Sequence, residues 1–474
     1  MDKYEQFKEE IAKAVESFRQ WDKNETIRLI GHLDSDGIAA SSIMIRALNN
    51  ANRKYSISIV HQLTQDVIKE LAAENYSYYF FVDLGSGQID AIKKTLANKT
   101  TIVLDHHEVE EFETNDNMTF INPHLLGIDG SKEIAGAGLA YLFASTLNEK
   151  NKDMAHIAIV GAIGDIQNNN GFLRLNEEIL REAEKQGKIK VTRGLKVFGG
   201  ETKPLHKVLE YSSDVFIPGV TGSESGAIQF LNDIGVDAKT GKDWNKLSRL
   251  EEEDLQKLAT GIILRRLSEK KPEDIFADVY TLVEEEKESP LRDAKEFSTL
   301  LNACGRLNKA SLGIGACLND KKIKLKAIRQ LTEYKKEIVN AMRWFDENKS
   351  SKNIMTEDGF MIINAEDNIM PTMIGTMASI ISKSGGFREG TLILSMARTD
   401  GKMTKISLRV AGHEANDMNL KDIIEEIVGK AEGSEIGGHK QAAGALIRTE
   451  KEHEFIEAAK SVLRRYAIEE KIGE

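Results

Sequence analysis

The sequence predicts an α/β protein in which a parallel-sheet domain carries a helical insertion and is joined by a long connecting helix to a smaller α/β domain. Three observations predict this fold class. Apolar β-rich runs alternate with helix-length segments over residues 26–124, a charged and helix-patterned stretch covers residues 177–287, and strand patterns return after residue 354. With 474 residues, 41% of them hydrophobic, the chain is long enough for two or three domains.

Five apolar runs predict the sheet of the first domain. They read TIRLIG, YSISIV, YYFFVDLG, TTIVLDHH and MTFINPH, and a later apolar helix reads MAHIAIVGAIGD. Strands that alternate with helices form parallel sheets, whose ligands bind beyond the carboxyl ends of the strands. We expect the first domain to occupy residues 1–320, with the mainly helical insertion at about residues 185–290.

The rest of the chain predicts a helix followed by a second domain. Residues 321–350 are periodic and contain neither proline nor glycine, as is typical of a long connecting helix. The runs FMIINAED, TLILSMAR and KISLRVAG then predict strands. We therefore expect a smaller α/β domain over residues 351–474.

Composition limits the function classes. The net charge of -11 argues against a general polyanion binder, so nucleic acid would have to meet local basic stretches such as residues 185–207 and 321–343. Two cysteines, Cys304 and Cys317, fit inert thiols in a reducing cytosol. The charged N-terminus does not resemble a signal peptide, and no apolar run reaches the roughly 18 residues that span a bilayer. We expect a cytoplasmic protein without membrane contact.

Four clusters of potential metal ligands stand at predicted strand or helix ends. They read GHLDSDG, VDLGSG, LDHHE and GAIGD, and contain His32, Asp34, Asp36, Asp83, Asp105, His106, His107 and Asp165. Carboxylates that share one crevice repel one another unless they are paired or coordinate cations. Oxygen ligands with one or two imidazoles suit Mn²⁺ or Mg²⁺ better than zinc. The clusters therefore predict a site for divalent metal.

The spacing within two clusters suggests separate roles. Asp34 and Asp36 would point to one face of an extended segment, so each could serve a different metal. His106 and His107 are adjacent and would diverge in an extended segment, which leaves one for metal and the other for substrate. Each cluster alone is also typical of a turn or a helix cap. The occurrence of all four within one predicted crevice favours the metal site.

The same residues resemble the DHH phosphoesterases, which are named for the tripeptide seen here as Asp105-His106-His107. HLDSDG, VDLG, LDHH and GAIGD resemble the four motifs of that family, and GSEIGGHKQAAGALI resembles the GGGH motif of its DHHA1 domain. Ser407-Leu408-Arg409 resembles the Ser-x-Arg motif, and LNACGR resembles the Asn-Ala-x-Gly-Arg segment of RecJ-like exonucleases. The helical middle is similar to the insertion of the archaeal RecJ-like branch, which associates with the GINS complex.

The resemblance implies a set of site residues and two divalent metal ions, with Mn²⁺ preferred and Mg²⁺ as the alternative. The implied metal ligands are His32, Asp34, Asp36, Asp83, His106 and Asp165, with Asp83 as the bridge. The implied catalytic residues are His107, Asp105 and Asp83. The implied substrate-binding residues are Arg306, Ser407, Arg409, Gly437, Gly438 and His439. Two positions depart from the family pattern: His32 stands where an aspartate is usual, and Ile436 replaces the first glycine of GGGH.

The activity implied by the resemblance is a single-strand-specific exonuclease in DNA replication or repair. It would digest DNA from the 5′ end, with RNA as an alternative substrate and the GINS complex as a partner. Two other functions stay open. One is a phosphodiesterase for short oligonucleotides or cyclic dinucleotides, and the other is a GINS-binding replication scaffold with secondary nuclease activity.

Overall fold

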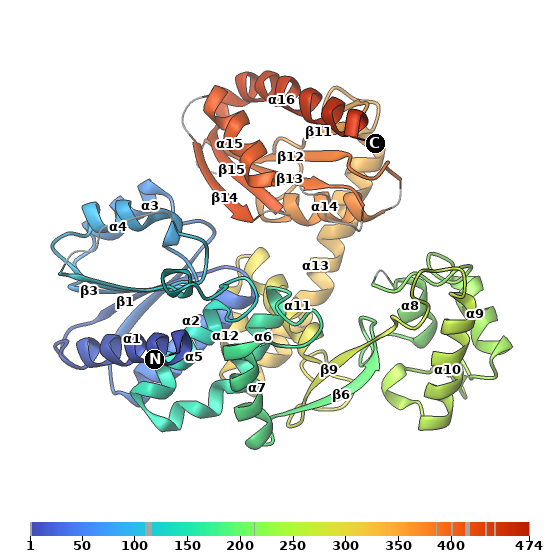
Figure 1. The fold of residues 1–474 in the computed structure, drawn as a ribbon, viewed down its shortest axis with the longest axis horizontal. Coiled ribbons are helices and arrows are strands. Elements are labelled where there is room, and N and C mark those ends of the chain that lie inside the picture. Colours follow the sequence, from blue (N-terminus) through green and yellow to red (C-terminus); the bar gives the residue numbers. More distant parts are fainter. Residues whose placement is uncertain are drawn as a thin grey trace. The chain divides into compact units, whose positions relative to one another are not determined.

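The computed structural model describes residues 2–109, 116–212, 214–384, 386–399, 402–412, 418–431, 434–439 and 442–473. The chain divides into two compact units, Met1–Gln330 and Leu331–Glu474. Each unit contains a sheet flanked by helices, which confirms the predicted α/β class (Figure 1). None of the described helices is long and apolar enough to cross a membrane.

The first unit is built on a five-stranded parallel sheet with the strand order β2-β1-β3-β4-β5. Its strands are β1 (Ile27–His32), β2 (Tyr55–Val60), β3 (Tyr78–Val82), β4 (Thr100–Leu104) and β5 (Met118–Ile121). Its helices include α1 (Lys3–Arg19), α2 (Ser35–Asn50), α3 (Gln65–Ala73), α4 (Ile89–Thr95), α5 (Gly136–Leu147) and α6 (Ala155–Gly164). The predicted alternation of strands and helices is confirmed.

Helices cover both faces of this sheet, as the side chains of β3 show. Tyr79 and Phe81 belong to an apolar cluster with residues of α3 and α4. Phe80 points to the opposite face, where its ring lies 5.9 Å from that of Phe18 in α1 and 5.2 Å from that of Phe143 in α5. Burial on both faces explains why the strands read as continuous apolar runs. Polar side chains are therefore confined to the strand ends.

The insertion is less uniformly helical than the sequence predicts. After α7 (Arg174–Lys185), it contains the helices α8 (Leu205–Glu210), α9 (Glu224–Asp233) and α10 (Glu252–Arg265). It also contains the antiparallel pair β6 (Ile189–Leu195) and β9 (Phe276–Leu282) and the short strands β7 (Lys239–Thr240) and β8 (Asp243–Trp244). The strands β6 and β9 form a ribbon that leads to α8–α10 (Figure 1). Most residues of this ribbon are at least half-exposed and several are charged, so its strand pattern is weak in the sequence.

A buried carboxyl group connects the insertion to α11 (Ala294–Arg306). Glu296 is 3% exposed and accepts hydrogen bonds from the Glu201 amide (3.1 Å) and from the Thr202 hydroxyl. Burial raises the pKa of Glu296 to about 7. The group therefore carries a charge at neutral pH only at a cost in stability.

We expect Glu296→Gln to make stability less dependent on pH. Because the pKa of Glu296 is higher in the folded state than its ordinary value of 4.5, its contribution to stability is present below pH 4.5 and is lost as pH rises through about 7. The free energy of unfolding of the variant, relative to wild type, should rise by up to about 3 kcal/mol between pH 5 and 8. Urea unfolding at pH 5 and pH 8 measures this difference in the free energy of unfolding. The exposed Glu251→Gln is the control. If both variants showed the same dependence of stability on pH, the role of Glu296 would be contradicted.

The first unit ends with α12 (Ala310–Cys317) and the start of α13 (Lys321–Asn348), which also contributes to the second unit. The thiols of Cys304 and Cys317 are buried, and burial raises the pKa of each to about 12. Both thiols stay protonated at neutral pH, as expected of inert core cysteines.

The second unit has a six-stranded sheet with the order β10-β11-β12-β13-β15-β14. The strands are β10 (Ile354–Glu357), β11 (Phe360–Asn364), β12 (Leu392–Arg398), β13 (Met403–Val410), β14 (Ser434–His439) and β15 (Ala442–Arg448). Its helices are α14 (Pro371–Lys383), α15 (Leu420–Ala431) and α16 (Glu452–Gly473). The pair β11–β12 is parallel and the other pairs are antiparallel.

Candidate metal centre

The acidic and histidine clusters meet at one edge of the parallel sheet. His32 is the last residue of β1, and Asp83 and Asp105 directly follow β3 and β4. These three strands are neighbours in the sheet, so their carboxyl ends lie side by side. Asp83 adopts a positive φ of 59°, which turns the chain immediately after β3.

The Asp-x-Asp segment lies at a helix start, which corrects the expectation of an extended segment. Asp34 caps α2 and accepts a hydrogen bond from the Gly37 amide at 3.0 Å, and Asp36 lies in the first turn. Asp36 is fully buried, and its carboxylate accepts hydrogen bonds from the amides of Gly136 (2.6 Å) and Ala137 (3.0 Å) at the start of α5. Two helix N-termini therefore hold the two carboxylates in place.

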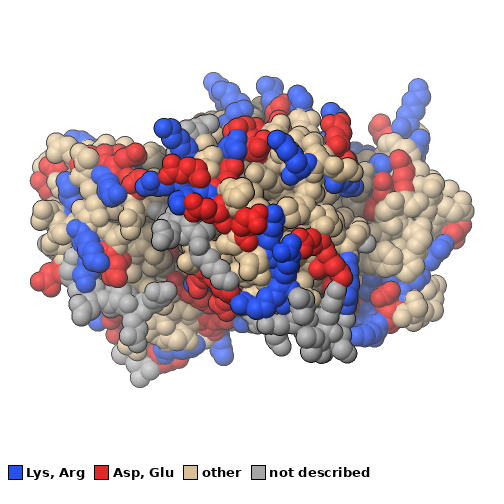
Figure 2. Space-filling model, turned by 90° about the horizontal axis from the view of Figure 1, so that it is seen from above, with Lys and Arg blue, Asp and Glu red and all other residues tan. Residues whose placement is uncertain are grey.

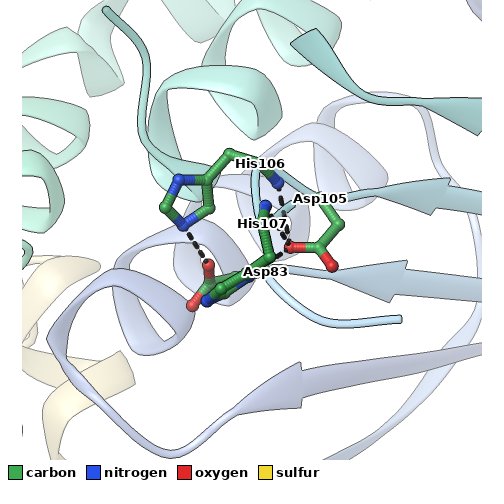
Figure 3. Close-up of side chains that lie close together, drawn as sticks. All are labelled: Asp83, Asp105, His106 and His107. Carbon is green, nitrogen blue, oxygen red and sulfur yellow. Dashed lines mark hydrogen bonds and ion pairs between the residues drawn. The ribbon is translucent and has the colours of Figure 1, made fainter. Parts of the chain in front are cut away.

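All six predicted metal ligands come together in two groups. One group is His32, Asp34 and Asp83, the other is Asp36, His106 and Asp165, and the ligand atoms within each group lie within 4.8 Å of one another. Asp83 also contacts the second group. Its Oδ2 lies 3.7 Å from His32 Nδ1, and its Oδ1 lies 3.2 Å from His106 Nε2, the pair drawn in Figure 3. The carboxylate of Asp83 thus lies between the two groups.

The hydrogen bonds of His106 show that this site fits a cation. His106 Nδ1 lies 2.7 Å from the Gly130 carbonyl oxygen, which can only accept, so Nδ1 carries the hydrogen. In the neutral ring Nε2 then points a lone pair at the carboxylates of Asp83 (3.2 Å), Asp165 (3.3 Å) and Asp36 (3.7 Å). An electron pair facing three carboxylates requires a proton or a metal ion between them. The donor set of oxygens and imidazole nitrogens suits Mn²⁺ or Mg²⁺.

The electrostatics of the site agree with this arrangement. Burial and the charges of Asp83 and Asp165 raise the pKa of Asp36 well above its usual range. Burial by itself lowers the pKa of His106, but the carboxylates of Asp165 and Asp83 outweigh it and raise that pKa. Burial favours the neutral form of Asp34, yet the charge of His32 outweighs burial and lowers the pKa of Asp34. The excess negative charge is what a divalent cation would neutralise.

Asp105 orients His107, and these two residues form a third group with Asp83 and His106 whose potential ligand atoms also lie within 4.8 Å of one another. Its carboxylate accepts hydrogen bonds from His107 Nδ1 (2.7 Å, Figure 3) and from the Ser86 amide (2.7 Å), and it is 1% exposed. Burial by itself lowers the pKa of His107, but the charge of Asp105 outweighs burial and raises it. The ring of His107 is 33% exposed, so a substrate could reach it.

The rings of His106 and His107 diverge less than we expect from the sequence. Their centroids lie 4.5 Å apart with an angle of 50° between the planes. The expectation assumed an extended chain, but β4 ends at Leu104, before both histidines. A turn of the chain therefore brings both rings to the same edge of the sheet.

Several residues that support the site were missed in the sequence. A Cβ at Gly136 would lie 2.4 Å from Asp83 Oδ1, and a Cβ at Gly161 would lie 2.5 Å from Asp36 Oδ1. Only glycine leaves room for the two carboxylates at these positions. The run IAGAG at residues 134–138 is a visible signal for such a close approach, but its partner residues cannot be read from the sequence.

A buried pair of amide side chains holds the carbonyl that orients His106. Gln167 Nε2 donates to the Gly130 carbonyl oxygen (2.9 Å), which also accepts from His106. Asn176 Nδ2 donates to Gln167 Oε1 (2.7 Å), and both amides are at least 95% buried. Such outer hydrogen bonds fix the direction of a ligand and tune its affinity for metal.

We expect Gln167→Leu to weaken metal binding by about 10- to 100-fold, because the Gly130 carbonyl and the ring of His106 lose their fixed position. Calorimetric titration with Mn²⁺ measures the affinity, and thermal unfolding without metal checks the fold. The exposed Gln256→Leu is the control. An unchanged Mn²⁺ affinity of the Gln167 variant would contradict this role.

The segment with Arg306 lies directly against the loop that carries two of the ligands. Asn302 Oδ1 accepts a hydrogen bond from the Ser35 amide at 3.0 Å. A Cβ at Gly305 would lie 1.7 Å from the Leu33 carbonyl oxygen, so the two backbones touch there. Arg306 follows as the last residue of α11 and is half-buried.

The predicted substrate-binding residues of the second unit share one region of its sheet. Ser407 and Arg409 are alternate residues of β13, and a Cβ at Gly375 in α14 would lie 3.1 Å from Ser407 Oγ and 3.3 Å from Arg409 Nη2. Ser407 and Gly437 both pair with Gly444 of β15. Gly438 and His439 follow in β14, and their side chains lie outside the described residues.

One lysine in each basic stretch forms an ion pair with a glutamate. Lys188 lies 2.7 Å from Glu284, and Lys324 lies 2.5 Å from Glu285. Both lysines line one small cavity of about 70 Å³ together with these carboxylates. On the face shown in Figure 2, lysine and arginine side chains are mixed with aspartate and glutamate. Such charge-balanced positions contribute little to the binding of a polyanion.

Comparison with known proteins identifies three domains along the chain. The N-terminal domain of the DHH family matches residues 26–164, the DHH-CID domain matches residues 197–279, and the DHHA1 domain matches residues 358–465. An uncharacterized protein of Methanocaldococcus jannaschii is 32% identical over 92% of this chain and 93% of its own length. The single-stranded-DNA-specific exonuclease RecJ of Bacillus subtilis is 25% identical over 38% of this chain and 24% of its own length.

Solved structures share the fold over almost the whole chain. RecJ of Thermus thermophilus in complex with Mn²⁺ matches 97% of this chain with a TM-score of 0.57 and 16% identity, and the chain spans 55% of that structure. CDC45 of Entamoeba histolytica matches 96% of this chain and 99% of its own length, with a TM-score of 0.62 and 12% identity. At the level of the family, the DHH match and the RecJ relative support a phosphoesterase or nuclease. The chain belongs to the DHH/DHHA1 family and has a RecJ-like fold.

Proposed function

We propose that this protein is a metal-dependent exonuclease that hydrolyses the phosphodiester bonds of single-stranded DNA from the 5′ end, with RNA as an alternative substrate, in DNA replication or repair. The observation that carries the proposal is the meeting of two groups of metal ligands around one shared carboxylate, Asp83. Two-metal sites of this kind are typical of enzymes that hydrolyse phosphodiesters. The RecJ exonuclease of Bacillus subtilis supports the choice of single-stranded DNA.

The two groups assign the metal ligands. His32 and Asp34 would hold one divalent cation, Asp36, His106 and Asp165 the other, and Asp83 would bridge them. When bound, Mn²⁺ or Mg²⁺ would supply an activated water and neutralise the charge of the phosphate. RecJ of Thermus thermophilus has been solved in complex with Mn²⁺ and with Mg²⁺, which supports a divalent cation of this class.

The chain's own residues complete the hydrolysis. Water adds to phosphorus, the bond from phosphorus to the leaving sugar oxygen breaks, and that oxygen takes up a proton. His107 would contact the phosphate or supply this proton, since its ring is partly exposed and its Nδ1 is held by Asp105 at 2.7 Å. The carboxylate of Asp105 would stabilise the protonated ring and fix its direction.

The remaining phosphates of the strand need separate contacts. Arg306 of the first unit and Ser407, Arg409, Gly437, Gly438 and His439 of the second would provide them. An arginine guanidinium forms paired hydrogen bonds with phosphate, and glycine lets backbone amides approach an anion closely.

Digestion of end-labelled single strands tests this function. We expect DNA, and RNA to a lesser extent, to be degraded from the 5′ end with Mn²⁺, more slowly with Mg²⁺, and not at all with chelator. Strands of graded length separate this activity from hydrolysis of short oligonucleotides or cyclic dinucleotides. A wild-type protein that leaves every substrate intact with Mn²⁺ would refute the proposal.

The likeness to CDC45 supports a second candidate function, a replication scaffold that binds the GINS complex through residues 197–279. The complete set of six ligands argues against scaffolding as the sole function. An Asp83→Asn protein that still binds GINS but degrades no DNA would show that both functions reside in one chain. A wild type that binds GINS and lacks nuclease activity would favour the scaffold alone.

A further inference from the structure

A groove of about 270 Å³ opens in the first unit between the edge strand β2 and helix α12. Its walls include Ile57 and Ile59 of β2, followed by His61, and Ser311 and Ile314 of α12. Ile57, Ile59 and His61 are alternate residues, so their side chains share one face of the sheet. Every residue of β2 is half-exposed, which shows that α12 leaves this face partly uncovered.

The groove is lined in part by the segments that carry candidate site residues. Leu33 and Gly305 also line it. Leu33 stands between His32 and Asp34, and Gly305 immediately precedes Arg306. The close approach of Gly305 to the Leu33 carbonyl oxygen joins the two segments. The groove therefore adjoins the chain segments that carry His32, Asp34 and Arg306.

The lining favours a flat, uncharged group with a polar edge. Isoleucine and leucine side chains form the walls, and the polar groups are His61, Asn308 and Ser311. His61 Nε2 lies 2.7 Å from Asn308 Oδ1, so an imidazole and an amide stand together at the rim. None of the described lining residues is lysine or arginine, which argues against a phosphate as the occupant.

We propose that this groove receives a nucleobase of the substrate strand, next to the phosphate that is hydrolysed. Aliphatic walls would contact the faces of the base, and the imidazole, amide and hydroxyl groups would meet its edge. The inference rests on the proposed nuclease function and adds a base-binding subsite to it. The groove lies on the face of β2 rather than along its hydrogen-bonding edge, so it does not suit a peptide that adds a strand to the sheet.

Two separate changes test the subsite: a larger side chain that fills the groove, and a DNA strand that lacks one base. Ser311 is an exposed residue of the first turn of α12, so Ser311→Phe should fold and occupy the groove. We expect the variant to raise KM for single-stranded DNA about 10-fold, with a smaller effect on kcat. Ser225→Phe places the same side chain at the matching exposed position of α9 and serves as the control.

Strands with one abasic residue identify the position of the base. Wild type should lose about 10-fold in kcat/KM when the abasic residue falls at one particular position near the cleaved bond. Ser311→Phe should not discriminate between the abasic strand and the intact strand. His61→Ala, which opens the groove, should reduce the discrimination as well.

The possible failures are distinguishable. If wild type cleaves neither DNA nor a simple chromogenic phosphodiester, the proposed function fails. If wild type cleaves DNA but is indifferent to every abasic position, or if Ser311→Phe discriminates as wild type does, the base subsite is wrong while the nuclease function stands. Binding of labelled DNA in the presence of chelator gives a second readout, in which Ser311→Phe should again bind about 10-fold more weakly than the control.

Discussion

Asp83→Asn is expected to reduce nuclease activity by about 10³-fold or more and to weaken Mn²⁺ binding at both ligand groups. The substitution keeps the size of the side chain but removes the negative charge that lies 3.2 Å from His106 and 3.7 Å from His32. Asp83 is 1% exposed, and neither of its carboxylate oxygens accepts a hydrogen bond from another residue that the structure describes, as is expected of a buried carboxylate that binds a metal ion. Single-turnover digestion and calorimetry with Mn²⁺ measure both effects.

The matched control for this variant is Asp90→Asn, an exposed aspartate seven residues further along the chain. It should retain wild-type activity and affinity for Mn²⁺. If Asp83→Asn kept more than about a tenth of wild-type activity at saturating Mn²⁺, Asp83 would not be a shared ligand.

Gly136→Ala is expected to lower activity by about 10²-fold with little loss of stability. The added methyl group would lie 2.4 Å from Asp83 Oδ1, so either that carboxylate or the start of α5 must move. A shift of α5 also displaces the Gly136 amide, which donates to Asp36 at 2.6 Å. One methyl group thereby disturbs both ligand groups, while alanine itself is favourable in a helix.

The activity and the Mn²⁺ affinity of Gly136→Ala should be compared with those of Gly87→Ala. Gly87 lies in the turn after β3, and an added Cβ there has nothing within 4 Å. The control should behave as wild type. Activity of Gly136→Ala within two-fold of wild type would show that the fit around Asp83 is looser than the structure describes.

The sequence predicts the sheet well, and the candidate ligands lie close together as expected, because both depend on local patterns. Strands buried on both faces are continuous apolar runs, and the ligands stand where these runs end. The predicted conformation of Asp34 and Asp36 was wrong. These residues lie where β1 ends and α2 begins, and the sequence does not show whether they are extended or helical. The prediction also failed for β6 and β9, a partly exposed ribbon whose apolar runs are interrupted by Lys190, Arg193 and Asp278.

The supporting residues of the site could not be predicted, because each acts through a contact that is distant in sequence. Gly130 and Gln167 are 37 positions apart, yet they meet at one carbonyl oxygen beside His106. Gly136 is 100 positions from Asp36, whose carboxylate its amide binds. The run IAGAG signals a close approach at Gly136, but neither a glycine nor an amide shows in the sequence which distant residue it meets. Their function becomes visible only when the fold brings them to the metal ligands.

The most direct test of the metal centre is a crystal structure of the protein with Mn²⁺, with the ions located by their anomalous scattering. The account predicts two peaks, one among His32, Asp34 and Asp83 and the other among Asp36, His106 and Asp165, with Asp83 contacting both. If the peaks lay elsewhere, the proposed metal centre would be contradicted. It would also be contradicted if no ion were bound by these six side chains at saturating Mn²⁺.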